Sequence, residues 1–187
     1  MEEKTAKYFD APGEANTAHC LNVAKTEAEE NGYKNIIVAS TTGETGAIFA
    51  EAFKSVDANL MIVTYADDKG ESAIPEKTRN KILDSGATIF NAPPISLSID
   101  RSFGDEYGEQ RPSQIVHDTL LWFGQGMAAC CKCVMSATDG GLLQEGMEVV
   151  AVAGTLKGAD TVAVVKAASS KRFRELKVLE ILAKPRA

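Results

Sequence analysis

The sequence is short of histidine and of long apolar runs, and each shortage excludes a class of protein. Only 2 of the 187 residues are histidines and no nucleophile elbow appears, so a Ser-His-Asp hydrolase is not supported. No apolar run approaches the ~18 residues that a membrane-spanning helix needs. The start, Met1-Glu2-Glu3-Lys4, is followed by no apolar signal-peptide segment. We therefore expect no membrane partner.

Positive charge is also in short supply. The chain has 20 Lys and Arg residues against 26 Asp and Glu, which gives a formal net charge of -6. Nucleic-acid backbones are held by Lys and Arg, so this balance argues against a nucleic-acid partner. It does not argue against one bound phosphate, because backbone amides at a helix N-terminus can hold a single anion.

Cysteines are few, and three of the four crowd one short segment: Cys130, Cys131 and Cys133. Such crowding is a poor disulfide framework, so we expect a reducing cytoplasm. Zinc ligands usually come as pairs with a second pair elsewhere, and we expect no metal site. If 130–137 is a strand, Cys131 and Cys133 share one face as buried thiols. A thiol beside a flavin is the open alternative.

What the sequence does contain is an alternation of helical and strand patterns. One domain over 1–187 fits the length, and a chain of this size buries roughly 70% of its unfolded surface. The expected helices are 15–31, 44–53, 75–85 and 112–123. The expected strands are 35–40, 60–65, 87–90, 130–137, 148–153, 161–167 and 176–182. The irregular stretch 91–110 is typical of a lid or binding loop.

This order predicts the fold class. Alternating helices and strands in the first two-thirds indicate a parallel sheet with helices on both faces. The linker 154–160 is too short for a crossover helix, so strands 148–153 and 161–167 should pair as an antiparallel hairpin. We expect an α/β protein, a three-layer α/β/α sandwich with a mostly parallel mixed sheet.

The loop after the first strand has the composition of a phosphate site. A helix N-terminus offers unpaired N–H groups and roughly half a positive charge, hydroxyls add donors, and glycines allow close approach. In open α/β sheets such a loop lies where ligands bind. It is neither a Walker A motif nor GxGxxG. A well-capped helix start is the alternative, and the Glu44 carboxylate competes for the same terminus. The expected phosphate contacts are Ser40, Thr41, Thr42, Gly43, Thr45 and Gly46.

Topology brings other residues toward this loop. The helix 15–31 precedes the first strand and runs antiparallel to it, so Asn16 and Thr17 should lie near the loop and can cap the helix. The helix starting near Pro112 should do the same before strand 130–137. His19 is a packing or surface residue, with ligand contact as the alternative. Trp122 is expected in the core or at an interface.

Several segments together resemble one known family. The segment 36–53, with Val-Ala-Ser-Thr-Thr-Gly-Glu-Thr-Gly, is similar to the first strand–loop–helix of the pyruvate kinase C-terminal domain. The match extends to the small stand-alone "pyruvate kinase α/β domain" proteins and covers nearly the whole chain. Its other motifs are Asn16-Thr17, Val63-Thr64-Tyr65, Phe123-Gly124-Gln125-Gly126 and Gly154-Thr155-Leu156-Lys157-Gly158-Ala159-Asp160-Thr161.

The resemblance implies a pyruvate kinase C-terminal-domain fold and a bound flavin mononucleotide (FMN), or a sugar-phosphate effector at the corresponding loop. It places the phosphate at the Ser40–Gly46 loop and adds Thr64 to the cofactor contacts. The chain departs from the family at Gly46, where alanine is commoner. The catalytic barrel of pyruvate kinase is absent from these 187 residues, so we expect no pyruvate kinase activity.

The second glycine-containing loop is open to two interpretations. It is either only a hairpin connection, with Gly154 and Gly158 at positions of positive φ and Asp160 bonding its own backbone, or part of the ligand site. In the second case Thr155 and Thr161 contact ligand, and Asp160 accepts a sugar or ribityl hydroxyl. Arg101 either neutralises phosphate or is a solvated loop residue.

Three hypotheses of function follow. The first is an FMN-binding protein, a flavin-dependent redox enzyme of unknown substrate. The second is a non-catalytic regulatory module that senses a sugar phosphate or nucleotide. The third is a homo-oligomer in which this chain is an interface scaffold with a vestigial pocket.

Overall fold

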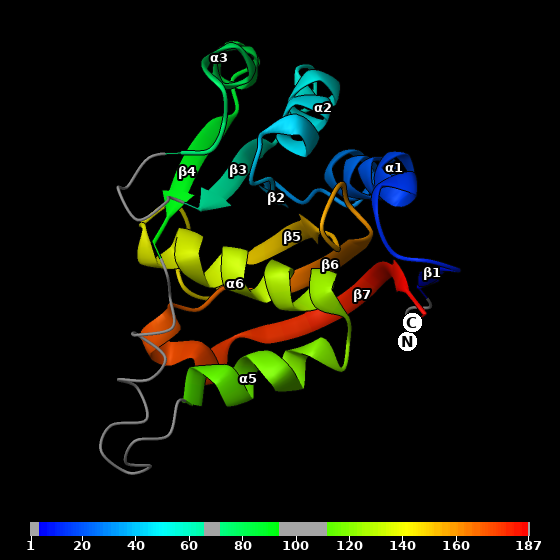
Figure 1. Ribbon diagram of the computed structural model, residues 1–187, viewed down its shortest axis with the longest axis vertical. Coiled ribbons are helices and arrows are strands. Elements are labelled where there is room, and N and C mark those ends of the chain that lie inside the picture. The colour runs from blue at the N-terminus through cyan, green and yellow to red at the C-terminus, as the bar shows by residue number, and fades with distance from the viewer. Residues whose placement is uncertain (1–3, 66–71, 94–111, 187) are drawn as a thin grey trace.

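The computed structural model describes residues 4–65, 72–93 and 112–186, which build one seven-stranded sheet between helices (Figure 1). The strands are β1 (Lys7–Phe9), β2 (Asn35–Ala39), β3 (Asn59–Tyr65), β4 (Thr88–Ala92), β5 (Glu148–Ala153), β6 (Thr161–Lys166) and β7 (Lys177–Pro185). Their order is β1-β7-β6-β5-β2-β3-β4. Four pairings are parallel, and those of β6 with β5 and β7 are antiparallel. The expected α/β class with a mostly parallel mixed sheet is confirmed.

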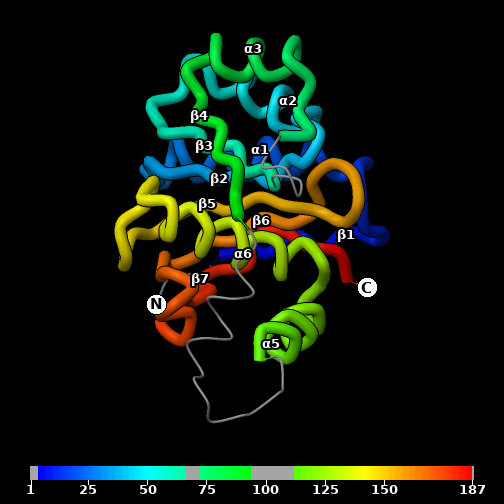
Figure 2. Tube along the Cα trace, turned by 60° about the vertical axis from the view of Figure 1, so that its left-hand side comes forward, coloured from blue at the N-terminus to red at the C-terminus, as the bar shows by residue number. Residues whose placement is uncertain are grey.

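Helices cover both faces of the sheet. They are η1 (Glu14–Asn16), α1 (Thr17–Glu29), α2 (Glu44–Phe53), α3 (Glu76–Asp84), α5 (Pro112–Leu121), α6 (Gln125–Asp139) and η3 (Ser170–Glu175). Helices α1, α2 and α3 lie on one face, whereas α6 covers the other face with α5 beyond it (Figures 1 and 2). Within the described ranges, none of these helices is both apolar and long enough to cross a bilayer.

The sheet separates two apolar clusters. Alternate residues of a strand point to opposite faces, so Ile36 and Val38 of β2 pack with Phe49 of α2, whereas Ile37 packs with Val134 of α6. The central strands are therefore buried on both faces, which explains their unbroken β-branched runs. Burying each such side chain contributes roughly 1.5–3 kcal/mol.

The expected strand 130–137 is wrong, because this segment belongs to helix α6. A short apolar run suits a buried strand and a buried helix equally, and only length decides between them. Here the run continues from Gln125 to Asp139, and it is rich in the good helix formers Ala and Met. Cys130 and Cys133 are consequently one helical turn apart, not on opposite faces of a strand.

Other expectations differ at their boundaries. The antiparallel hairpin of β5 and β6 is confirmed, with Val150 opposite Val164. The last strand extends to Pro185, beyond the expected 182. Strand β1 was not expected, since three residues carry too little periodicity to be recognised; it pairs parallel with β7. The expected irregular stretch 91–110 begins inside β4, and its residues after 93 lie outside the described ranges.

The connections place a topological switch at β2. From β2 the chain passes through α2 to β3 and through α3 to β4, on one face of the sheet. It then returns through α5 and α6 on the other face to β5, which pairs with β2 on the side away from β3. Helix α2, which follows β2, and helix α6, which precedes β5, therefore lie on opposite faces of the sheet. The carboxyl ends of β2 and β5 lie between the N-termini of these two helices. Ligands of open α/β sheets bind at such a point.

Candidate functional site

A cavity of about 240 Å³ opens at this switch point. It lies between the carboxyl ends of β2, β3 and β5 and the first turns of α2 and α6. The residues that line it are Ala39, Ser40, Thr41, Thr42, Glu44, Thr45, Tyr65, Gln125, Ala129, Gly154, Leu156, Lys157 and Gly158. Four of the six loop residues expected from the sequence are among them.

The first turn of α2 leaves two backbone donors unpaired on residues that line the cavity. The N–H of Ala47 is the first to reach a backbone carbonyl, on Gly43 at 2.8 Å, and the N–H of Gly46 donates to Ser40 Oγ at 2.9 Å. Within the described parts of the chain, the N–H groups of Glu44 and Thr45 have no acceptor. Ser40 is itself fixed, because its N–H donates to the carbonyl of Val63 at 2.9 Å.

The two loop glycines do not line the cavity, contrary to expectation. A Cβ on Gly43 (φ 83°) would lie 2.7 Å from Cγ2 of Ile74, and one on Gly46 would lie 2.6 Å from Cγ2 of Ile62. Both glycines therefore serve packing against the residues beneath the loop. The N–H of Gly46 is also already bonded to Ser40, so Gly46 offers the ligand no donor.

A second helix N-terminus meets the first, but it belongs to α6 and not to the helix that starts at Pro112. Gln125 and Ala129 of α6 line the cavity. The N–H of Ala128 donates to the carbonyl of Gly124 at 3.2 Å, and no side chain caps this end. A Cβ on Gly126 would lie 2.1 Å from Oγ1 of Thr161, so this glycine lets α6 begin close against β6. This helix N-terminus was not predicted, because residues 130–137 were expected to form a strand.

The loop after β5 is held by a buried carboxylate. Asp160 is 0% exposed, and it accepts hydrogen bonds from the N–H of Gly13 (2.9 Å), the N–H of Thr155 (3.0 Å) and the hydroxyl of Thr161 (2.8 Å). Both oxygens are thus occupied, and neither Asp160 nor Thr161 lines the cavity. The structure favours the hairpin interpretation for these two residues. Thr155 is also outside the lining, although its neighbours Gly154 and Leu156 belong to it.

The start of α1 supports this loop from behind. Thr17 Oγ1 accepts the N–H of Ala159 at 3.0 Å and donates to the carbonyl of Glu14 at 2.7 Å. A Cβ on Gly158 (φ 72°) would lie 2.5 Å from the Cα of Glu14, so only glycine permits this approach. Asn16 points elsewhere, to the carbonyl of Ala11 at 2.8 Å, and neither caps α1 nor lines the cavity.

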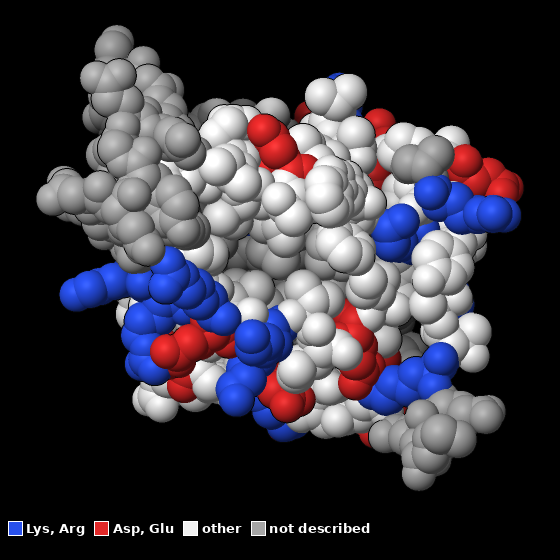
Figure 3. All heavy atoms as spheres, turned by 90° about the horizontal axis from the view of Figure 1, so that it is seen from below, with Lys and Arg blue, Asp and Glu red and all other residues white. Residues whose placement is uncertain are grey.

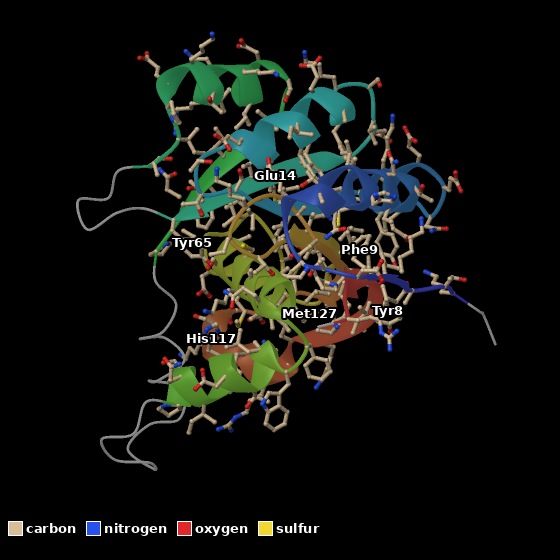
Figure 4. All side chains as sticks on the ribbon, turned by 45° about the vertical axis from the view of Figure 1, so that its right-hand side comes forward. Tyr8, Phe9, Glu14, Tyr65, His117 and Met127 are labelled. Carbon is tan, nitrogen blue, oxygen red and sulfur yellow. The ribbon has the colours of Figure 1, made fainter. Side chains whose placement is uncertain are left out.

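Tyr65, which the sequence analysis did not single out as a contact, lines the wall of the cavity at the end of β3 (Figure 4). Its hydroxyl interacts electrostatically with the thiol of Cys133 on α6. Burial raises the pKa of Tyr65 and raises that of Cys133 to about 12, so both groups stay protonated at neutral pH. The adjacent Thr64 is 0% exposed; its Oγ1 donates to the carbonyl of Thr41 at 3.0 Å, which positions the loop.

Among the described residues, one acidic and one basic side chain line the cavity. Glu44 and Lys157 both line it and both are exposed. Lys132 follows one turn after Ala129 on α6, and burial lowers its pKa. Lys157 and Gln125 were not expected as site residues, although both stand in motifs quoted from the sequence. The signal that could have found them is their position, because Lys157 follows the end of β5 and Gln125 begins α6.

The remaining candidates lie away from the cavity or outside the described ranges. His19 is exposed and its ring packs 6.0 Å from that of Phe9. Trp122, in the turn directly after α5, is 82% exposed, so its expected place in the core is wrong. Arg101 lies outside the described residues. Within the described ranges no group of three His, Cys, Asp or Glu side chains is arranged to hold a metal, and all four cysteines are free and buried.

Basic side chains elsewhere on the surface are interleaved with acidic ones. On the face seen from below in Figure 3, Lys and Arg alternate with Asp and Glu. Arg172 forms ion pairs with Glu145 and Glu175, beside a groove that Lys166 and Lys177 also line. The positive charge of this groove is thus partly neutralised by the protein's own carboxylates.

No protein-family model matches the sequence. Among solved structures, the chain is similar to a crystal structure of a pyridoxal 5'-phosphate-dependent aspartate racemase, with 14% identity and a TM-score of 0.34. The match covers 75% of this chain and 47% of that chain, so this chain spans about half of that structure. A likeness this weak decides neither the finer fold family nor the activity.

Proposed function

We propose that this protein binds a phosphorylated small molecule in the cavity at the switch point, with the phosphate against the first turns of α2 and α6. The observation that carries the proposal is the convergence of these two helix N-termini, whose first turns keep backbone N–H groups unpaired within the described residues, on one cavity lined by hydroxyl groups. Ser40, Thr41, Thr42 and Thr45 supply the hydroxyls. The ammonium group of Lys157 supplies a full positive charge.

The physical basis is electrostatic. Each helix N-terminus carries roughly half a positive charge, contributing about 0.3–1 kcal/mol toward a nearby anion. Unpaired N–H groups are the donors that phosphate oxygens accept, and charge-assisted hydrogen bonds are about twice as strong as neutral ones. Glu44 opposes the anion, but its exposed side chain is free to turn toward solvent.

FMN is the ligand that we propose first, within a pyruvate kinase C-terminal-domain type of fold and a cytoplasmic protein. The sequence motifs at 36–53 and 154–161 support this choice through their resemblance to the stand-alone pyruvate kinase α/β domain proteins. Tyr65 at the cavity wall adds an aromatic side chain of the kind that packs on a flavin ring. The flavin would supply the redox chemistry, and this chain would bind and orient it.

The rival ligand is a sugar phosphate sensed by a non-catalytic module. The size of the cavity favours it, because about 240 Å³ is below the ~300–1,000 Å³ usual for sites that bury a drug-sized ligand. A phosphate with one sugar ring fits a volume of this order more fully than a flavin does.

One screen tests the proposal and separates the two ligands. Thermal unfolding is followed with FMN, riboflavin, ribose 5-phosphate, nucleotides and inorganic phosphate at equal concentrations. A ligand at 100 times its Kd stabilises by about 2.7 kcal/mol. We expect FMN to raise Tm and riboflavin, which lacks the phosphate, to raise it much less. If none of the phosphorylated compounds shifts Tm, the proposed function is wrong.

A further inference from the structure

Leu156, at the rim of the cavity, has an unusual backbone. Its φ is 62°, and it is the one residue other than glycine with positive φ in the described ranges. The N–H of Lys157 donates to the carbonyl of Thr155 at 2.8 Å, across Leu156. A positive φ spanned by a bond between residues i and i+2 has the pattern of the classic γ-turn, which is rare and strained. Leucine has none of the local side-chain hydrogen bonding that lets Asn or Asp adopt this region.

The side chain of Leu156 is also fully exposed, at 102% of its reference area. This exposure is not the consequence of a loose loop tip, because the backbone is anchored on both sides. The N–H of Thr155 before it is bonded to Asp160, and Gly158 after it packs on Glu14. The protein therefore holds an exposed apolar residue at the edge of the cavity, in a backbone conformation that glycine would adopt without strain.

We propose that Leu156 is a specificity-determining residue that packs on a flat apolar ring of the ligand, and so selects a flavin- or nucleotide-type phosphate over a sugar phosphate. This inference rests on the proposed function, which places the phosphate at the helix N-termini. The ring then extends from the phosphate toward the rim, where Leu156 and Tyr65 both line the cavity. Covering the exposed Leu156 side chain removes apolar surface from water only when the ligand carries such a ring.

Two variants test the role of the side chain. Leu156→Gly removes it and fits the backbone, so the variant should fold as well as wild type. Leu156→Met keeps an apolar side chain of similar size. Each protein is titrated calorimetrically with FMN, riboflavin and ribose 5-phosphate. We expect Leu156→Gly to weaken FMN about tenfold and to leave ribose 5-phosphate within about twofold, with Leu156→Met near wild type for both.

The other outcomes overturn the inference. Unchanged FMN affinity in Leu156→Gly means that the side chain contacts no ring. Equal losses for FMN and ribose 5-phosphate mean that it acts through the loop on the phosphate. The proposed function is tested separately, with the wild-type protein alone. If wild type binds neither FMN nor ribose 5-phosphate, the proposed site is wrong and so is the inference about Leu156. Equal wild-type affinity for FMN and riboflavin removes only the phosphate contact, and the Leu156→Gly comparison on FMN still decides the ring contact.

Discussion

Ser40 Oγ accepts a hydrogen bond of 2.9 Å from the N–H of Gly46, six residues further along the chain. This bond closes the loop between β2 and α2 and occupies the N–H of the third helical residue. The N–H groups of the two residues before it, Glu44 and Thr45, have no acceptor within the described residues, and both residues line the cavity. One serine thus both stabilises the helix start and determines which donors remain for an anion.

Replacing Ser40 by alanine should lower the free energy of unfolding by about 1–2 kcal/mol, because the buried N–H of Gly46 loses its acceptor. Urea unfolding measures this loss. Ser136→Ala is the matched control: that hydroxyl is also buried, on α6, and has no hydrogen-bond partner among the described residues. We expect the control to cost nothing, and equal losses from both variants would show that the Ser40 bond is unimportant.

Asp160→Ala should destabilise the protein by about 2–3 kcal/mol, because the N–H groups of Gly13 and Thr155 and the hydroxyl of Thr161 all lose their acceptor. Chemical denaturation measures the change. A variant as stable as wild type that loses ligand binding would instead support the direct ligand contact considered from the sequence.

The sequence was sufficient for those features that depend on local chemistry. The strand at Ile36–Ala39, the glycine after α1 and the hairpin across the short linker 154–160 all appear as expected. The loop hydroxyls were also found, because helix starts after parallel strands lie at a known edge of the sheet.

What failed depends on tertiary context. The run from Met127 to Ala137 is interrupted only by Lys132 and Ser136, because α6 is covered by the sheet, α5 and η3, so its polar residues are too few to mark a helical period. Gly46 and Asp160 were both expected from the sequence to contact ligand. In the structure Gly46 packs against Ile62, and Asp160 accepts a hydrogen bond from the N–H of Gly13. The role of a residue cannot be predicted from the local sequence pattern when that role is determined by residues distant in the sequence.

The buried thiols should make stability fall at high pH. Burial raises the pKa of Cys20 from 9.0 to about 12, so between these values the unfolded chain has lost a proton that the folded chain keeps. Stability is therefore lost as pH rises above about 9. Between pH 9 and 10.5, Cys20 should account for about 1–2 kcal/mol of the decline. Urea unfolding of wild type and Cys20→Ala between pH 9 and 10.5 measures this contribution to the free energy of unfolding. If that free energy falls equally with pH in both proteins, the prediction is wrong.

The affinity of the Thr42→Asp variant for FMN tests the central claim most directly. A carboxylate in the loop just before α2 repels a phosphate bound at the start of that helix, so Kd should rise about 100-fold or more. Thr88→Asp, the same change at an exposed position on β4, is the control and should bind as wild type does. Flavin fluorescence titration gives both values. If Thr42→Asp binds FMN with wild-type affinity, the phosphate does not lie at the start of α2.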